Sequence, residues 1–180
     1  MMVCAGLGSA LSLQTLQDMM EDPLPGPTAG PAAPPIAVGG IEAARWVREH
    51  TPADEMIATN AHCRIPSAEP PCDARNFWIA AFSERTMLVE GWSYVDWSTI
   101  GRTRPPGQDH IDGDFWDPRR LADNDAALQH PTEATVERLR GRYGVTWLII
   151  DTRYPYDRLG LGHFAKVAFT AGRYRVLELN

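Results

Sequence analysis

The sequence predicts an α/β domain with a small mixed sheet flanked by helices, a C-terminal β-hairpin and a long irregular loop region. Two helix-to-strand units indicate this fold class: residues 41–50 followed by 55–60, and residues 133–143 followed by 145–151. A helix that leads directly into a buried strand is the building block of α/β folds. The run 145–151 is apolar without alternation, which is typical of a strand covered on both faces.

The folded domain is expected to span residues 41–180. Residues 21–40 contain six prolines, a density that excludes helix and sheet and predicts a linker. Residues 1–20 are mildly apolar, but they lack the positive start of a secretory signal and the apolar length of a spanning helix. Two interpretations remain for them: an N-terminal tail, or the end of a membrane helix whose earlier part is absent from this chain.

Local signals place the elements of the domain. In the first helix Ile41, Ala44 and Val47 share one face, and Pro52 ends the helix because it disfavours a helical Thr51. Residues 75–84 favour a helix, and residues 85–92 favour a strand.

Residues 98–130 are rich in Gly, Pro and Asp, and they predict a long loop with at most one short helix, near residues 118–129. Thr132 is placed to cap the next helix, and Gly144 to end it. Two strands around Ala171-Gly172 form the terminal hairpin.

The charge balance argues against nucleic acid as a partner. The net charge is −6, and the 17 basic residues are dispersed along the chain. Phosphate binding needs a concentrated basic face.

Cys63 and Cys72 lie nine positions apart in a proline-rich segment. A zinc site is disfavoured because His62 and Cys63 are adjacent and cannot easily bind one ion, and Cys72 and Asp73 repeat the problem. A short turn-rich loop can bring two sulfur atoms within disulfide distance. We therefore favour a disulfide, which would imply an oxidising compartment, with unpaired thiols, a metal site or a nucleophile as the alternatives.

An acidic stretch near residue 110 is a candidate metal site. Alternating aspartates with a glycine can wrap a hard cation such as Ca²⁺, although the distal glutamate of an EF-hand loop is missing. A solvated polar loop would have the same composition. The candidate ligands are Asp109, His110, Asp112 and Asp114.

Aromatic residues beside carboxylates form a candidate carbohydrate site. Rings can cover the apolar face of a sugar, and acids can accept hydrogen bonds from its hydroxyls. The alternative is that these rings fill the core where a strand ends. The candidate ligand-binding residues are Glu90, Trp92, Tyr94 and Trp97, with Arg85 as a potential contact to phosphate or carboxylate.

The order of these motifs resembles a known group of proteins. The pattern A-x-x-W-V-R-x-x-T-P-x-D (residues 43–54), R-x-x-L-V-E-G (85–91) and L-x-x-x-Y-G-V-x-W-L-I-x-D (139–151) is similar to soluble domains that follow the last membrane helices in the GT-C glycosyltransferase superfamily. The likeness covers residues 40–179. It is greatest to actinobacterial integral membrane proteins, which share T-N-x-H-C (59–63), P-P-C-D (70–73) and F-W-D-P-x-x-L-x-x-N-D-A-A (115–127).

The resemblance implies a membrane-associated domain on the extracytoplasmic face, where Cys63 and Cys72 could pair. In that superfamily the catalytic acids lie between membrane helices, so no catalytic residue is transferred to this chain. The expected function is a non-catalytic domain that supports or covers a membrane-embedded active site in the same or a related protein. The alternatives are a stand-alone carbohydrate- or metal-binding module, with Ca²⁺ as the metal, and a small hydrolase that uses His110.

Overall fold

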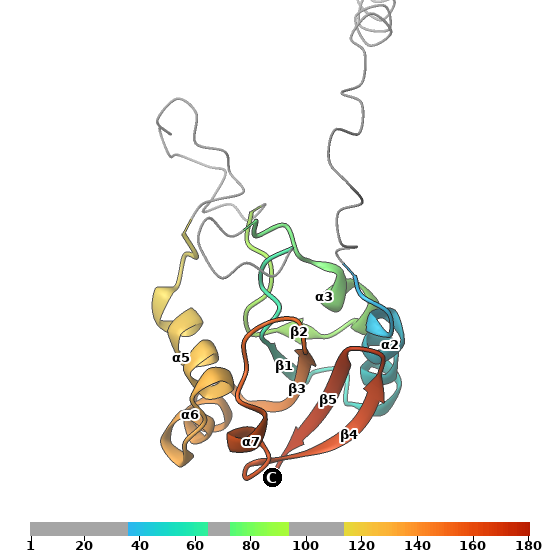
Figure 1. The fold of residues 1–180 in the computed structure, drawn as a ribbon. Helices are drawn as coiled ribbons and strands as arrows, with labels where there is room; N and C mark the ends of the chain where they lie inside the picture. The colour runs from blue at the N-terminus through green and yellow to red at the C-terminus, as the bar shows by residue number, and fades with distance from the viewer. Residues whose placement is uncertain (1–35, 65–72, 94–113) are drawn as a thin grey trace, which may run out of the picture. The chain divides into compact units, whose positions relative to one another are not determined.

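The computed structural model describes residues 36–64, 73–93 and 114–180. Their centre is a mixed sheet of five strands in the order β2-β1-β3-β5-β4 (Figure 1). The strands are β1 (Met56–Thr59), β2 (Thr86–Met87), β3 (Val145–Asp151), β4 (Ala165–Ala171) and β5 (Tyr174–Leu179). Strand β1 pairs in parallel with β2 and β3, while β5 runs antiparallel to β3 and β4. The predicted fold class, including the terminal hairpin, is confirmed.

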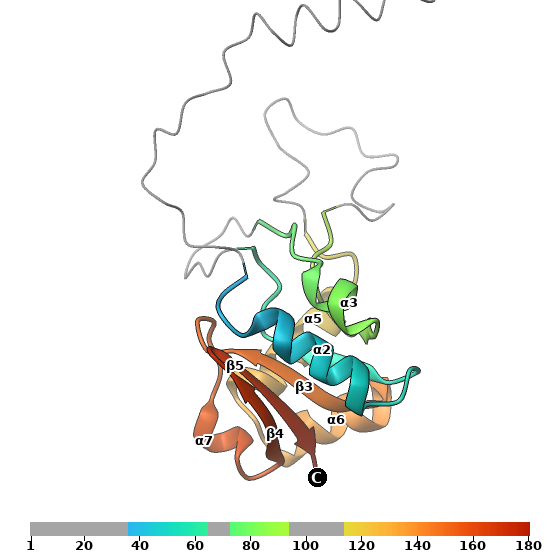
Figure 2. The same ribbon diagram turned by 90° about the vertical axis from the view of Figure 1, so that its right-hand side faces the viewer.

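Helices cover both faces of this sheet (Figure 2). Helices α2 (Gly40–His50) and α3 (Trp78–Ser83) lie on one face, and α5 (Pro118–Gln129) and α6 (Glu133–Tyr143) lie on the other. A further short helix, α7 (Arg158–Leu161), buries Leu161 in the same core as α5 and α6. The sheet therefore separates two apolar cores.

Strand β3 shows why its sequence is continuously apolar. Leu148 and Ile150 pack into the core beneath α5 and α6, whereas Ile149 packs into the core beneath α2 and α3. All three side chains are fully buried. Successive side chains of a strand point to opposite faces, so a strand between two helical layers needs apolar residues at every position.

The predicted limits of α6 are confirmed. The side chain of Thr132 accepts a hydrogen bond from the backbone of Thr135, and the Thr135 side chain accepts one from the backbone of Thr132. Gly144 ends the helix with a φ of 70°, a conformation that glycine adopts without steric cost.

Two elements differ from the expectation. The predicted strand 85–92 pairs only over Thr86–Met87. Beyond it the chain turns to residues 74–76, where the amide of Gly91 donates to the Asn76 carbonyl and a Cβ at position 91 would lie 2.5 Å from that oxygen. Helix α7 was not predicted; its sequence signal is Asp157, whose side chain caps it by accepting from the amide of Gly160.

Strand β4 forms one edge of the sheet. Its register with β5 shifts between Val167 and Phe169, which is the signature of a bulge or a similar irregularity. Val167 is 58% exposed.

Arg85 joins the carboxyl ends of α2 and α3. Its guanidinium group donates to the carbonyls of Arg48 and Thr51 at the end of α2, and to those of Ser83 and Glu84 at the end of α3. Its Nε also donates to Thr51 Oγ1, at 3.0 Å. Carbonyls at a helix end lack partners within the helix and carry partial negative charge, so one buried cation satisfies two helix ends.

We predict that Arg85→Lys lowers the free energy of unfolding by about 2–4 kcal/mol, because an ammonium group keeps the charge but cannot reach both helix ends. Urea unfolding followed by circular dichroism measures this. Arg140→Lys, at an exposed position of α6, is the matched control and should change stability by less than about 0.5 kcal/mol. Equal stability of Arg85→Lys and the parent would contradict this role.

Candidate functional site

The carboxyl ends of β1 and β3 form a topological switch point. The chain passes from β1 to β2 through α3 on one face, and from β2 to β3 through α5 and α6 on the other. The connections that leave the neighbouring carboxyl ends of β1 and β3 run in opposite directions along the sheet: β1 leads to β2 on one side, and β3 leads through α7 to β4 at the other edge. In open α/β sheets, ligands bind in the crevice at such a point.

Asn60 ties these two strand ends together. Its Oδ1 accepts from the amide of Asp151 at 2.9 Å, and its Nδ2 donates to the Asp151 carbonyl at 3.0 Å. The same Nδ2 also lies 3.3 Å from the carbonyl oxygens of Tyr154 and Pro155. The side chain thus continues the β1–β3 pairing beyond the last residue of β1 and fixes the direction in which the chain leaves it.

Two residues beyond Asn60, His62 meets helix α5. His62 Nε2 lies 2.7 Å from Asp125 Oδ1. The neighbouring Asn124 donates through Nδ2 to the Thr59 carbonyl at 3.0 Å and to Asp125 Oδ1 at 3.1 Å. His62 is 8% exposed and Asn124 is fully buried. This polar cluster therefore lies in the protein interior, next to the carboxyl end of β1.

The start of α5 explains how its residues reach this edge. Pro118 occupies the first turn, where its missing N–H costs nothing, and the Asp117 side chain accepts from the amide of Arg120 at 3.0 Å. The helix then buries Asn124, Ala127 and Leu128. Asp125 follows Asn124, so it lies at the border of that buried face, and its side chain stays 35% exposed.

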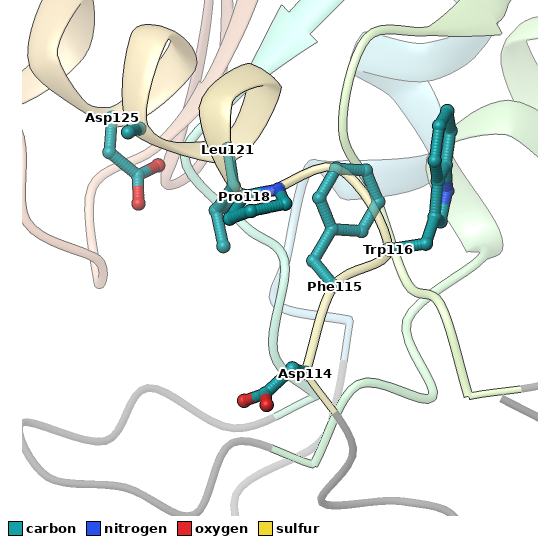
Figure 3. A pocket seen from close by; sticks show the side chains of 7 residues that line it. Asp114, Phe115, Trp116, Pro118, Leu121 and Asp125 are labelled. Atoms are coloured by element: carbon teal, nitrogen blue, oxygen red, sulfur yellow. The ribbon is translucent and has the colours of Figure 1, made fainter. Parts of the chain in front are cut away.

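A pocket of about 600 Å³ opens beside Asp125 (Figure 3). Pro118 and Leu121 lie between the carboxylates of Asp125 and Asp114, and Phe115 lies next to them. We call this the α5 pocket; its lining residues are Asp114, Phe115, Trp116, Pro118, Leu121, Ala122 and Asp125. It combines an apolar, partly aromatic wall with two carboxylates.

The aromatic wall is anchored in the core on one side and open on the other. Phe115 packs against Trp92, with ring centroids 5.2 Å apart, and against Trp116 at 5.5 Å. Trp116 is 43% exposed. The guanidinium carbon of Arg120 lies 4.6 Å from the centroid of the Trp116 ring, a cation–π contact that restrains the indole.

The structure distributes the predicted ligand-binding residues over different environments. Trp92 is 6% exposed and belongs to the core beneath α5 and α6, and Arg85 is engaged at the helix ends described above. Tyr94 and Trp97 lie outside the described residues.

Glu90 is buried at the start of α3. Its carboxylate accepts hydrogen bonds from the amides of Ile79 at 2.7 Å and of Ala80 at 3.2 Å. Burial raises the pKa of Glu90 to about 7, and these amide hydrogen bonds oppose that rise. The side chain therefore titrates near neutral pH while holding a helix end.

Of the predicted metal ligands only Asp114 is described, and it lines the α5 pocket. Asp109, His110 and Asp112 lie outside the described residues. Within residues 36–64, 73–93 and 114–180, no group of three or more His, Cys, Asp or Glu side chains is arranged to hold a metal ion.

The predicted Cys63–Cys72 disulfide stays a prediction, because Cys72 lies outside the described residues. Cys63 is partly buried, and its carbonyl accepts a hydrogen bond from the Tyr154 hydroxyl. The residues that follow the two cysteines meet: the amide of Arg64 donates to the Asp73 carbonyl at 2.7 Å. The ends of this loop are thus held close together.

An ion pair between Arg75 and Asp73 stabilises the returning end of that loop. Arg75 donates to both carboxylate oxygens of Asp73, at 2.8 and 2.7 Å. These hydrogen bonds from Arg75 are the largest influence on the Asp73 carboxyl and contribute to a lowered pKa, against the opposing effect of burial.

Two sequence motifs contain residues of the α5 pocket and of the His62 cluster that are not predicted from the sequence to form a site. Phe115, Trp116, Asn124 and Asp125 all fall in the motif F-W-D-P-x-x-L-x-x-N-D-A-A, and His62 falls in T-N-x-H-C. Taken alone, each motif indicates only the resemblance described above. Their convergence depends on the order of the strands, which neither motif reveals.

No family model, curated protein or solved structure matches this chain. Among the helices of the described residues, none has the length and apolar character needed to cross a membrane.

We predict that stability decreases as the pH rises from 5 to 8 because of Glu90. Its pKa in the folded state, about 7, lies above the ordinary value of 4.5. Its contribution is therefore complete below pH 4.5 and is lost as the pH rises past 7, with a limit of about 3 kcal/mol.

Urea unfolding at several pH values, compared between the parent and Glu90→Gln, measures this contribution. The decrease should be smaller in Glu90→Gln, which has no proton to lose. Glu137→Gln, at an exposed position of α6, should retain the parent's pH dependence. If the free energy of unfolding of Glu90→Gln fell with pH as steeply as that of the parent, a group other than Glu90 would cause the pH dependence.

Proposed function

We propose that this domain is a non-catalytic binding domain that holds a carbohydrate in the α5 pocket. The observation that carries the proposal is the combination of the half-exposed ring of Trp116 with the carboxylates of Asp114 and Asp125 around one opening. A pocket of about 600 Å³ has the volume of a site for a small molecule.

A sugar matches this combination because it has two kinds of surface. Its C–H groups form an apolar face that packs on aromatic rings and aliphatic side chains, and Trp116, Leu121 and Pro118 supply such groups. Its hydroxyls donate hydrogen bonds, and the carboxylates of Asp114 and Asp125 accept them. The proposed site at residues 114–125 uses the same aromatic and acidic chemistry as the candidate carbohydrate site at residues 90–97.

The resemblance to extracytoplasmic domains of GT-C glycosyltransferase-like membrane proteins supplies the proposed setting. In this setting the domain lies on the extracytoplasmic face and supports or covers a membrane-embedded active site. The motif at residues 115–127, which with the cysteine motifs is the more specific part of the resemblance, is also the motif that builds the α5 pocket. The pocket would then hold a sugar chain close to that active site.

We predict that neutral oligosaccharides bind this domain and that Trp116→Ala weakens the binding about tenfold or more, because the apolar face of the sugar loses its aromatic platform. Isothermal titration calorimetry with a panel of neutral di- to tetrasaccharides measures the affinities. Trp46→Phe, which alters a partly buried indole on α2, is the control and should bind like the parent. Absence of binding by every sugar at millimolar concentration, or parental affinity in Trp116→Ala, would reject the proposed site.

The predicted disulfide between Cys63 and Cys72 supports the proposed location, because disulfides persist in oxidising compartments. We predict that the protein, secreted through an oxidising compartment and then denatured without reductant, has one reactive thiol, that of Cys4, and that reduction exposes three. Mass spectrometry of alkylated peptides measures this and identifies the pair. Two alkylated peptides containing Cys63 and Cys72 before reduction would remove the support for an extracytoplasmic location.

A further inference from the structure

The cluster of His62, Asn124 and Asp125 contains two acceptors that have no hydrogen-bond donor. Among the described residues, His62 Nδ1 and Asn124 Oδ1 are buried without a partner. Buried polar atoms are nearly always hydrogen-bonded, because an unsatisfied one destabilises the folded state. The cluster is therefore not explained as core packing alone.

The hydrogen bonds of the cluster determine which atoms carry protons. Asn124 Nδ2 lies 3.0 Å from the Thr59 carbonyl, 3.1 Å from Asp125 Oδ1 and 3.3 Å from His62 Nε2, and the two oxygen atoms, which can only accept, fix the orientation of the amide. His62 Nε2 lies 2.7 Å from the same Asp125 oxygen and must donate to it. In a neutral imidazole the other nitrogen, Nδ1, is then an acceptor.

Both donors therefore point at one oxygen of Asp125, the residue that borders the α5 pocket. The hydrogen bonds from His62 and Asn124 to Oδ1 of Asp125 hold its carboxylate in one orientation. The side chain remains 35% exposed on the pocket side. A group held in this way loses little conformational entropy when a ligand binds to it.

The charges around the pocket favour one class of ligand. Asp114 and Asp125 line it directly. Arg120 does not line the pocket; it lies over the Trp116 ring, and its Nε forms an ion pair with the Asp117 carboxylate at 3.5 Å. An anionic group in the pocket would face carboxylates, and like charges brought together in this way reduce affinity.

We propose that His62 is the positioning residue of the α5 pocket, and that the pocket takes neutral or amino sugars through hydroxyl or ammonium donors and rejects sugars that carry carboxylate, sulfate or phosphate. This inference rests on the proposed function and names its ligand class. His62 acts through Asp125 and does not contact the ligand itself.

The first test needs no ligand. NMR of protein labelled with ¹⁵N-histidine, with the signals of residue 62 identified by their absence in His62→Gln, reports the tautomer. We expect a protonated Nε2 and an unprotonated Nδ1, and we expect Asp125→Ala to change this distribution. A protonated Nδ1 with an unprotonated Nε2 would overturn the proposal, because His62 could not then donate to Asp125.

The second test measures selectivity by calorimetry. We expect the parent to bind a neutral oligosaccharide at least tenfold more tightly than the matched oligosaccharide that contains a uronic acid. His62→Phe should reduce this ratio severalfold, while His62→Gln, whose amide can donate to Asp125, should retain more of it. Unfolding curves for both variants identify any effect that comes from lost stability.

The outcomes separate the two proposals. A parental ratio in folded His62→Phe, or equal binding of the neutral and acidic sugars by the parent, would overturn the inference while leaving the pocket as a carbohydrate site. Absence of binding by any sugar would reject the proposed function, and the tautomer measurement would still decide whether His62 positions Asp125.

Discussion

The fold depends on the parallel pairing of β1 with β3, and the side chain of Asn60 completes that pairing. It accepts from the amide of Asp151 and donates to the Asp151 carbonyl, as a further residue of the strand would do. The side-chain amide of Asn60 thus takes the place of backbone pairing beyond the end of β1. Asn60 fixes the path of the chain after β1, and this path places His62 beside Asp125. The geometry of the pocket therefore depends on Asn60.

Polar groups are concentrated at the two ends of the parallel strands, for different reasons. At the amino end of β2, Arg85 satisfies helix carbonyls, and its hydrogen bonds are all directed into the protein. At the carboxyl end of β1, the cluster around His62 retains unsatisfied acceptors and borders an open pocket. Ser83 Oγ, close to Arg85, also lacks a partner, so the feature that distinguishes the end we assign to ligand binding is the open pocket beside its polar cluster.

The elements that could be predicted from the sequence are those with local causes. Pro52, Thr132 and Gly144 act on the backbone within one helical turn, so they reveal helix ends directly. The contact between His62 and Asp125 joins residues 63 positions apart, and it arises only because α5 crosses the sheet from β2 to β3. No local pattern encodes that crossing. Strand β2 was overestimated because the close approach of Gly91 to residues 74–76 is equally nonlocal.

The irregularity in β4 has a consequence for the protein at high concentration. An outermost strand presents free amides and carbonyls with which another molecule can continue the ladder. In β4 the register changes between Val167 and Phe169, so the spacing of these groups is interrupted halfway along the strand. A second copy aligned with one half of the strand would be out of phase with the other half. An irregularity of this kind disfavours the edge-to-edge pairing through which exposed strands form polymers.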